Sequence, residues 1–124
     1  MWSPRLSPDG RYLAAISHDN KTLYLRDNAR GSWRPCVSMD FVAEPVWPRE
    51  ASWIQFTAIL HNTNTSLYRI ETGCREARRV ADLSAHRVAG SDWTGITPDG
   101  SPMALLRIPD EIYAINWRLR LRLP

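Results

Sequence analysis

An all-β fold is predicted by a unit that recurs three times along this chain of 124 residues. Each copy begins with a proline-containing turn, continues with a strand-like run and reaches a second strand centred on a tyrosine. The turn prolines are Pro8, Pro48 and Pro98, and the tyrosines are Tyr24, Tyr68 and Tyr113. Their spacing of roughly 40–50 residues is typical of the four-stranded blades of a β-propeller. The sequence therefore predicts a partial β-propeller of about three four-stranded antiparallel blades.

The repeat also predicts how the chain is divided. The chain is expected to be a single propeller fragment over residues 1–124, with blades at approximately 3–43, 44–89 and 90–117 and a tail at 118–124. About three repeats are the minimum for a stable repeat array, and closed propellers have roughly four to eight blades. Three blades are therefore expected to leave an open arc.

Each unit opens with a turn whose residues have a physical reason to reverse the chain. Proline presets φ for the first central position, and an Asp-Gly pair supplies a side-chain hydrogen bond and tolerance of positive φ. The predicted turns are Ser7-Pro8-Asp9-Gly10, Trp47-Pro48-Arg49-Glu50 and Thr97-Pro98-Asp99-Gly100. Asp9 and Asp99 are accordingly interpreted as turn formers and not as catalytic acids.

The turns are followed by segments rich in β-branched and aromatic residues, which favour strands. The runs lie at Tyr12–Ser17, Trp53–Ile59 and Pro102–Arg107, and the predicted hairpins span Arg11–Asp27, Trp53–Ile70 and Pro102–Trp117. Arg75–Ala85 has some helical character. However, it follows the turn signal Glu71-Thr72-Gly73, so Ala77–Leu83 is predicted to be the third strand of its unit, as Trp33–Met39 is in the first.

The segment Leu6–Ala14 resembles the repeat of the WD-like propellers related to TolB, in which W-S-P-D-G opens a strand and L-Y-x-I closes the hairpin. Glu44–Pro48 and Trp53–Thr57 are similar to the same template. Trp93–Pro102, followed by Glu111–Trp117, resembles the closing blade of propellers in large bacterial regulators. The sequence departs from it in the middle turn, where Arg49-Glu50-Ala51-Ser52 replaces Asp-Gly, and at Leu6, where the family often has tryptophan.

This resemblance implies a non-catalytic interaction or sensor module at the C-terminal end of a larger bacterial regulator with a winged-helix or serine/threonine kinase domain. The alternative is the propeller of a prolyl-oligopeptidase-type peptidase, whose catalytic domain is absent from these residues. The expected partner is another protein or the remaining blades of a longer parent chain. A second copy of this chain, completing a six-bladed ring, is also considered.

The chain carries no motif that supports catalysis or cofactor binding. It lacks the GxSxG nucleophile elbow, the phosphate-binding glycine loops and HExxH. His18, His61 and His86 are far apart in sequence and are interpreted as solvated residues, although His18 and His61 fall at matching turns. We therefore expect no enzyme activity, no cofactor and no metal.

The two cysteines, Cys36 and Cys74, do not form a disulfide framework of the kind that small secreted domains use. No CxxC pair accompanies them, which argues against a structural zinc site. Partly buried free thiols are expected, with a disulfide as the alternative.

Charge and hydropathy limit the partners and the location. The net charge is +3, and Lys21 is the only lysine among 16 cationic residues. The arginines are scattered, so nucleic-acid binding is not expected. No apolar run could span a bilayer, and Met1–Arg5 does not begin a signal peptide. The chain is expected in the cytoplasm if it is complete, and in the periplasm if it belongs to a longer membrane-anchored parent.

The tail alternates with a period of two residues. In a strand, Arg118, Arg120 and Arg122 would share one face and form a stripe for an anion or a membrane surface. These arginines are the only candidate binding residues that the sequence offers. The alternatives are an edge strand whose charges discourage sheet-to-sheet pairing and unselected sequence beyond the domain.

Overall fold

The computed structural model describes residues 1–61, 65–82, 93–108, 111–116 and 121–123. Every regular element among them is a strand, and the strands form three sheets in chain order. The first sheet contains β1 (Trp2–Leu6), β2 (Tyr12–Ile16), β3 (Thr22–Asp27) and β4 (Ser32–Ser38). The second contains β5 (Phe41–Val46), β6 (Trp53–Ile59), β7 (Ser66–Glu71) and β8 (Arg78–Asp82). The third contains β9 (Trp93–Ile96), β10 (Pro102–Ile108), β11 (Glu111–Asn116) and β12 (Leu121–Leu123).

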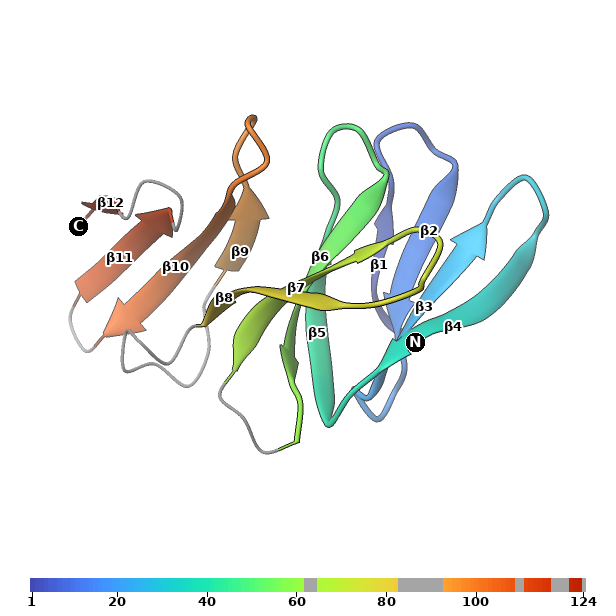
Figure 1. Cartoon of the computed structure of the whole chain (residues 1–124), viewed down its shortest axis with the longest axis horizontal. Coiled ribbons are helices and arrows are strands. Elements are labelled where there is room, and N and C mark those ends of the chain that lie inside the picture. The colour runs from blue at the N-terminus through green and yellow to red at the C-terminus, as the bar shows by residue number, and fades with distance from the viewer. Residues whose placement is uncertain (62–64, 83–92, 109–110, 117–120, 124) are drawn as a thin grey trace.

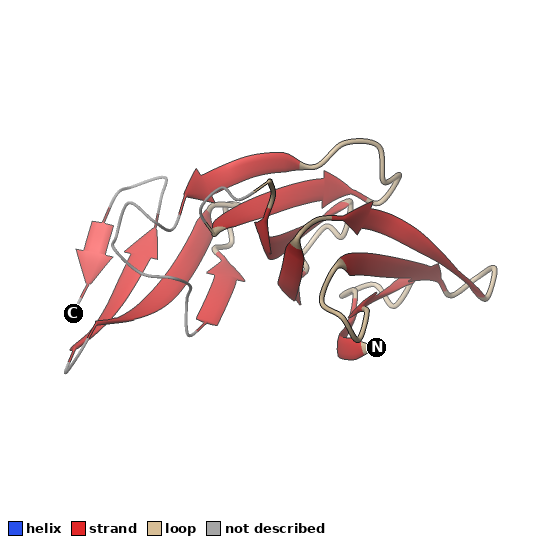
Figure 2. Cartoon of the chain, turned by 90° about the horizontal axis from the view of Figure 1, so that it is seen from below, coloured by secondary structure: helices blue, strands red, loops and turns tan. Residues whose placement is uncertain are grey.

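The three sheets follow one another along the long axis of the molecule, with the C-terminus at one end and the N-terminus within the region of the first sheet (Figures 1 and 2). All neighbouring strands pair antiparallel. The first strand of the second sheet, β5, contacts both β1 and β9, so the first strands of the three sheets lie together. This arrangement confirms the predicted partial β-propeller of antiparallel four-stranded sheets.

The predicted hairpins are present, because β2–β3, β6–β7 and β10–β11 pair in sequence order. Strands cross all three tyrosines of the repeat. Tyr24 lies opposite Ala15, and Tyr68 lies opposite Phe56, at the same register position of their sheets. Tyr113 lies opposite Leu106, further along its strand, so the equivalence holds only for the first two sheets. Within the segment that has helical character, Arg78–Asp82 form strand β8, inside the predicted strand Ala77–Leu83, whose last residue lies outside the described residues.

Two turns of the first sheet use the same set of hydrogen bonds. The Ser7 hydroxyl donates to Asp9 Oδ1 at 2.6 Å, and Ser7 Oγ accepts from the Tyr12 N–H at 3.0 Å. Ser17 and Asp19 repeat both contacts in the β2–β3 turn. Thr97 and Asp99 form the corresponding pair in the third sheet. Asp9 and Asp99 are therefore turn formers, as the sequence predicts.

The middle turn is shifted by one residue from its predicted position. The Ala51 N–H donates to Pro48 O, as the Gly10 N–H donates to Ser7 O. Pro48 therefore corresponds to Ser7, and the predicted match between Trp47 and Ser7 is wrong. Ala51 occupies the left-handed position of Gly10, with φ of 54° and 75° respectively. The missing glycine concealed this correspondence in the sequence.

Substitutions at this shared turn position are expected to differ in their cost to stability. Gly10→Ala should destabilise the chain by about 1 kcal/mol, because a side chain at positive φ is strained. Ala51→Gly relieves the same strain but removes a methyl group that is only 4% exposed, so it should change stability little. Urea unfolding of the two variants checks the pair. Equal losses of stability in both would contradict the assignment of Ala51 to the glycine position.

The two Ser–Asp turns should make stability depend on pH. The Ser7 hydroxyl and then the Arg11 backbone N–H lower the pKa of Asp9 below its ordinary value of 3.8. The Ser17 hydroxyl and the Lys21 N–H do the same to the pKa of Asp19. Because the folded-state pKa is depressed, the contribution is complete above the unfolded pKa and is lost as pH falls through the folded value.

Replacing both aspartates tests this pH dependence. Asp9→Asn/Asp19→Asn should unfold more easily at pH 7 and should lose less stability between pH 5 and pH 2 than the parent chain. Thermal unfolding across that pH range measures the difference. If the stability of the two proteins changed with pH in parallel, the two turns would contribute nothing to the pH dependence of stability.

The main apolar cluster lies between the first and second sheets. It is formed by buried residues on their facing sides: Ala14, Ile16, Leu23, Leu25, Met39, Val42, Ile54, Phe56, Ala58, Tyr68 and Ile70. The Phe56 ring stacks on Tyr68 with ring centroids 5.8 Å apart. Burial of a phenylalanine or leucine side chain contributes about 1.5–3 kcal/mol. This cluster therefore holds the first two sheets together.

The contact between the second and third sheets is more polar. Gln55 is fully buried, and its Nε2 donates to Gly95 O at 3.0 Å. Arg69 Nη2 donates to Gly100 O at 3.1 Å. Both bonds run from a strand of the second sheet to the backbone of the next sheet, so side-chain hydrogen bonds fix the position of the third sheet.

The sheets extend slightly beyond the predicted blade limits. Strand β5 begins at Phe41, so the predicted limit at residue 43 falls inside it, and a β-bulge interrupts its register with β6 between Ala43 and Val46. Within the predicted tail, Leu121–Leu123 forms β12 at the edge of the third sheet. The described part of the tail is therefore an edge strand, which both the charged-edge interpretation and the arginine-stripe interpretation require.

Cys36 and Cys74 form a disulfide, so the expectation of free thiols was wrong. Cys36 lies on β4, the outer strand of the first sheet, and Cys74 lies in the turn that follows β7 in the second. Their Cα atoms are 5.0 Å apart, within the range of disulfide-bonded pairs. Close packing of the two sheets brings the two residues together from 38 positions apart in the sequence.

Candidate binding site on the inner strands

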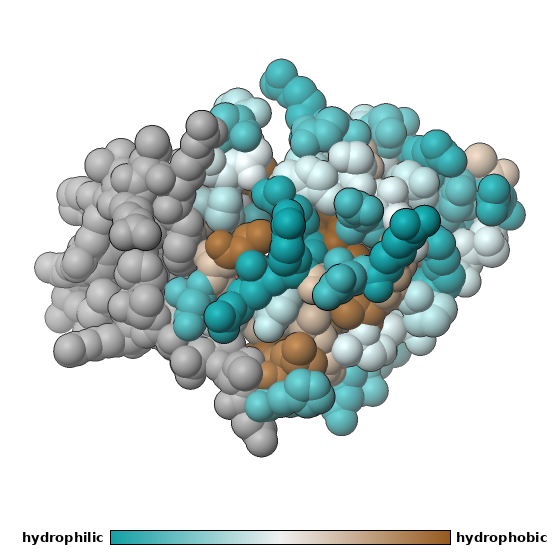
Figure 3. All heavy atoms as spheres, viewed as in Figure 1, coloured by the Kyte–Doolittle hydropathy of each residue, from teal (hydrophilic) through white to brown (hydrophobic). Residues whose placement is uncertain are grey.

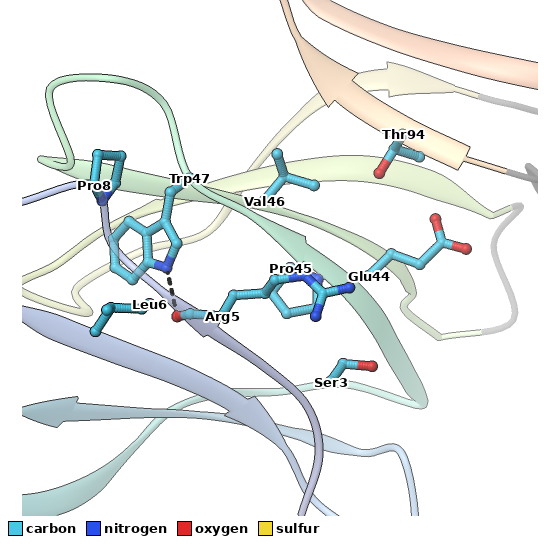
Figure 4. Close-up of a pocket in the computed structure, with 9 residues that line it drawn as sticks. All are labelled: Ser3, Arg5, Leu6, Pro8, Glu44, Pro45, Val46, Trp47 and Thr94. Carbon is cyan, nitrogen blue, oxygen red and sulfur yellow. Dashed lines mark hydrogen bonds between the residues drawn. The ribbon is translucent and has the colours of Figure 1, made fainter. Parts of the chain in front are cut away.

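We call β1, β5 and β9, the first strands of the three sheets, the inner strands. A recess of about 460 Å³, the inner-strand recess, opens where they lie together. Its walls come from β1, the turn after it, β5 and β9. The lining residues are Ser3, Arg5, Leu6, Pro8, Glu44, Pro45, Val46, Trp47 and Thr94 (Figure 4). The recess is therefore built from all three sheets and exists only when they are assembled.

Two matching β-bulges shape the walls of the recess. The pairing of β1 with β2 shifts between Trp2 and Arg5, and that of β5 with β6 shifts between Ala43 and Val46. Proline, which has no N–H to donate to a ladder, lies in each bulge at Pro4 and Pro45.

Ser3 and Glu44, which precede these prolines, have left-handed φ values of 50° and 52°. A residue before proline normally favours extended backbone. Strained backbone of this kind concentrates at functional sites. The repetition of one strained bulge on adjacent sheets indicates that both side chains are held in place for the recess.

Trp47 closes one end of the recess and ties the first two sheets together. Its Nε1–H donates to Arg5 O at 2.9 Å (Figure 4). Its ring stacks on Tyr12 with centroids 6.1 Å apart. Trp47 therefore packs between the first two sheets, and the same ring forms part of the wall of the recess.

The opposite end of the recess carries an unpaired polar group. Thr94 is only 4% exposed, and its hydroxyl has no hydrogen-bond partner in the structure. Glu44 extends its carboxylate toward the strand that bears Thr94 (Figure 4). Thr57 donates a hydrogen bond to this carboxylate at 3.4 Å. A buried hydroxyl without a partner is costly, so a ligand that bonded to it would gain affinity.

The candidates from the sequence that the structure describes do not line this recess. Arg118 and Arg120 are outside the described residues, and Arg122 lies on β12 opposite Ile115. His18 is exposed, with Nε2 2.8 Å from the amino group of Met1, and His61 is exposed at a separate turn. His86 is outside the described residues. Among the described residues, no group of three or more His, Cys, Asp and Glu side chains could hold a metal ion.

The residues of the recess were missed because each is unremarkable in its own segment. Glu44 and Thr94 are 50 positions apart, and no motif links them. One signal was present: the Ser3-Pro4 and Glu44-Pro45 pairs recur at almost the repeat distance. A search for a residue–proline pair that recurs in the first strand of each unit could have located the bulges.

The repeated sheets, the inner strands that lie together and the shared recess define a β-propeller. No family model matches the chain, and no curated protein matches its sequence. Its structure is similar to that of TolB from Acinetobacter baumannii, with a TM-score of 0.73 and 23% identity over 98% of this chain and 31% of that one. The putative TolB from Agrobacterium tumefaciens is similar with a TM-score of 0.68 and 15% identity over 98% of this chain and 48% of that one.

A structure from a study of two prolyl endopeptidases is also similar, with a TM-score of 0.68 and 16% identity over 98% of this chain and 21% of that one. The TolB-like propeller fold that the repeat predicts is therefore confirmed. This chain spans between about a third and a half of the TolB chains to which it is similar. The described residues contain no helix long and apolar enough to cross a membrane.

Proposed function

We propose that this chain is a non-catalytic binding module that recognises a protein partner through the inner-strand recess. In this proposal it forms part of a larger bacterial regulator with a winged-helix or serine/threonine kinase domain. The observation that carries the binding role is the buried, unpaired Thr94 hydroxyl at one end of a recess built from three sheets. The resemblance to propellers of bacterial regulators supports the larger context.

The chemistry of the recess supports binding over catalysis. None of its nine lining residues is a histidine, cysteine or lysine, so Ser3 lacks the histidine or lysine base that usually activates a serine hydroxyl. Arg5 and Glu44 supply opposite charges, and Trp47, Val46 and Leu6 supply apolar surface. A few polar groups within an apolar wall are typical of a recognition site.

A photo-crosslinking amino acid at position 94 tests this proposal in cells of the source organism. We expect a covalent adduct with one defined protein, which is then purified and bound again in isolation. Trp33, exposed on the outer strand β4, provides the control position. The same adduct from both positions, or no rebinding of the purified partner, would contradict recognition at the inner strands.

The alternative is the propeller of a prolyl-oligopeptidase-type peptidase, which the similarity to a prolyl endopeptidase structure favours. In that case the catalytic residues belong to a separate domain. The domain encoded in the same reading frame distinguishes the two proposals. A winged-helix or kinase domain supports the regulator, whereas a domain with GxSxG supports the peptidase.

The first sheet presents a face that fits another propeller sheet. Leu13, Ala15 and Tyr24 lie on the side of β2–β3 that points away from the second sheet. Their counterparts in the second sheet, Ile54, Phe56 and Tyr68, are buried against the first sheet. Leu13, Ala15 and Tyr24 therefore occupy the repeat positions that, in the second sheet, pack against the preceding sheet. In our proposal a further blade of the parent chain or of a second copy covers this face.

The disulfide favours an oxidising compartment, because disulfides are rare in the reducing cytosol. We therefore place the module in the periplasm within this proposal, instead of the cytoplasm expected by default. Alkylation of the protein directly in lysed source cells, followed by mass spectrometry, measures the state of Cys36 and Cys74. Two alkylated thiols in most molecules would contradict this location.

A further inference from the structure

A second recess, separate from the inner-strand site, lies at one end of the second sheet. It has a volume of about 440 Å³ and is lined by Trp53, Arg69, Glu71, Arg75, Glu76 and Arg78. These residues come from the start of β6, the end of β7, the following turn and the start of β8. Hydrophilic side chains gather over the part of the surface that β8 crosses (Figure 3). We name this feature the Arg69 recess.

Arg69 is held rigidly in this recess but is incompletely satisfied. Its guanidinium carbon lies 3.6 Å from the centroid of the Trp53 ring, within the range of a cation–π contact. Its Nη2 donates to Gly100 O at 3.1 Å, which fixes the orientation of the group. Its Nε is buried and has no hydrogen-bond partner. One donor of an oriented guanidinium therefore lacks an acceptor.

The neighbouring charges also favour an acceptor with negative charge. Arg78 lies directly opposite Arg69 in the β7–β8 pair, a position in which like charges destabilise a sheet. Burial and then the charge of Arg78 lower the pKa of Arg69, and Glu50 partly opposes them. Glu50 is itself bonded to the indole N–H of Trp53 at 3.2 Å. An anion between the two arginines would relieve their repulsion.

The charges that line the recess indicate which anion fits. Three arginines and two glutamates line it, so one positive charge is in excess. That excess matches a single carboxylate better than a dianion, which the glutamates would repel. Guanidinium groups bind carboxylates through paired hydrogen bonds. We propose that the Arg69 recess binds a carboxylate group through Arg69, Arg75 and Arg78.

Titration of the chain with sodium acetate, followed by NMR of the arginine Nε–H resonances, tests this proposal. Sodium chloride at equal ionic strength and inorganic phosphate are the comparison probes. We expect a saturable shift of the Arg69 Nε–H with acetate and only a small linear shift with chloride. Equal shifts with chloride, or tighter saturation with phosphate, would overturn the assignment to a carboxylate.

Variants on the same strand locate the site. Arg78→Gln should weaken the apparent affinity for acetate by roughly tenfold, since it removes a charged hydrogen-bond donor. Arg79→Gln is the matched control, because Arg79 is exposed and does not line the recess. If Arg78→Gln fails to fold, Arg75→Gln in the exposed turn replaces it. If the recess variant bound acetate with the same affinity as Arg79→Gln, the result would contradict the proposed site.

Discussion

Phe56→Ala is expected to lower the free energy of unfolding by about 3–5 kcal/mol. The Phe56 side chain is fully buried between the first two sheets and stacks on Tyr68. Truncation removes its apolar surface from the cluster and leaves a cavity, because the paired strands on either side restrict collapse. Urea unfolding at one fixed protein concentration measures the loss.

Phe41→Ala is the matched control for this prediction. Phe41 is the other phenylalanine of the chain, and it is 37% exposed at the start of β5. The same truncation there should cost less than about 1 kcal/mol, because little apolar surface leaves the core. If both variants lost the same free energy, the main cluster would not lie where the structure places it.

Loss of the disulfide between Cys36 and Cys74 is the second large effect. The bond closes a loop over a sequence separation of 38 residues, and reduction should lower the free energy of unfolding by about 2–4 kcal/mol. The bond joins the outer strand of the first sheet to a turn of the second, so reduction should also loosen the contact between these sheets. Urea unfolding with and without dithiothreitol measures the change.

The variant Cys36→Ser/Cys74→Ser provides the control for reduction. Its stability should be close to that of the reduced parent chain and should not respond to dithiothreitol. A parent chain that showed no response to the reductant, with the bond confirmed broken by mass spectrometry, would contradict a stabilising role.

The sequence was sufficient for the fold because the repeat signals are local. Pro8-Asp9-Gly10 and Pro98-Asp99-Gly100 form turns through contacts within a few residues, and the apolar runs behind them form strands. The middle turn was misplaced by one residue because Ala51 adopts a conformation that glycine usually marks. A turn without its usual residue gives no local signal, and only the hydrogen bond from Ala51 to Pro48 shows its position.

The disulfide and the inner-strand recess could not be predicted in the same way. Cys36 and Cys74 occupy different elements of adjacent sheets, and only the packing of those sheets makes them neighbours. Glu44 and Thr94 line the same recess because β5 and β9 lie side by side, which depends on the angle between the second and third sheets. Alternation within a strand carries no information about such angles.

We propose that these three sheets form an open arc of a propeller, which another sheet completes on the face of Leu13 and Tyr24. Light scattering of the isolated 124-residue chain, combined with thermal unfolding, tests it most directly. We predict self-association through this face, which Tyr24→Glu should disrupt and Phe41→Glu should leave intact. A soluble 14.2 kDa monomer with a sharp, cooperative unfolding transition would contradict the claim.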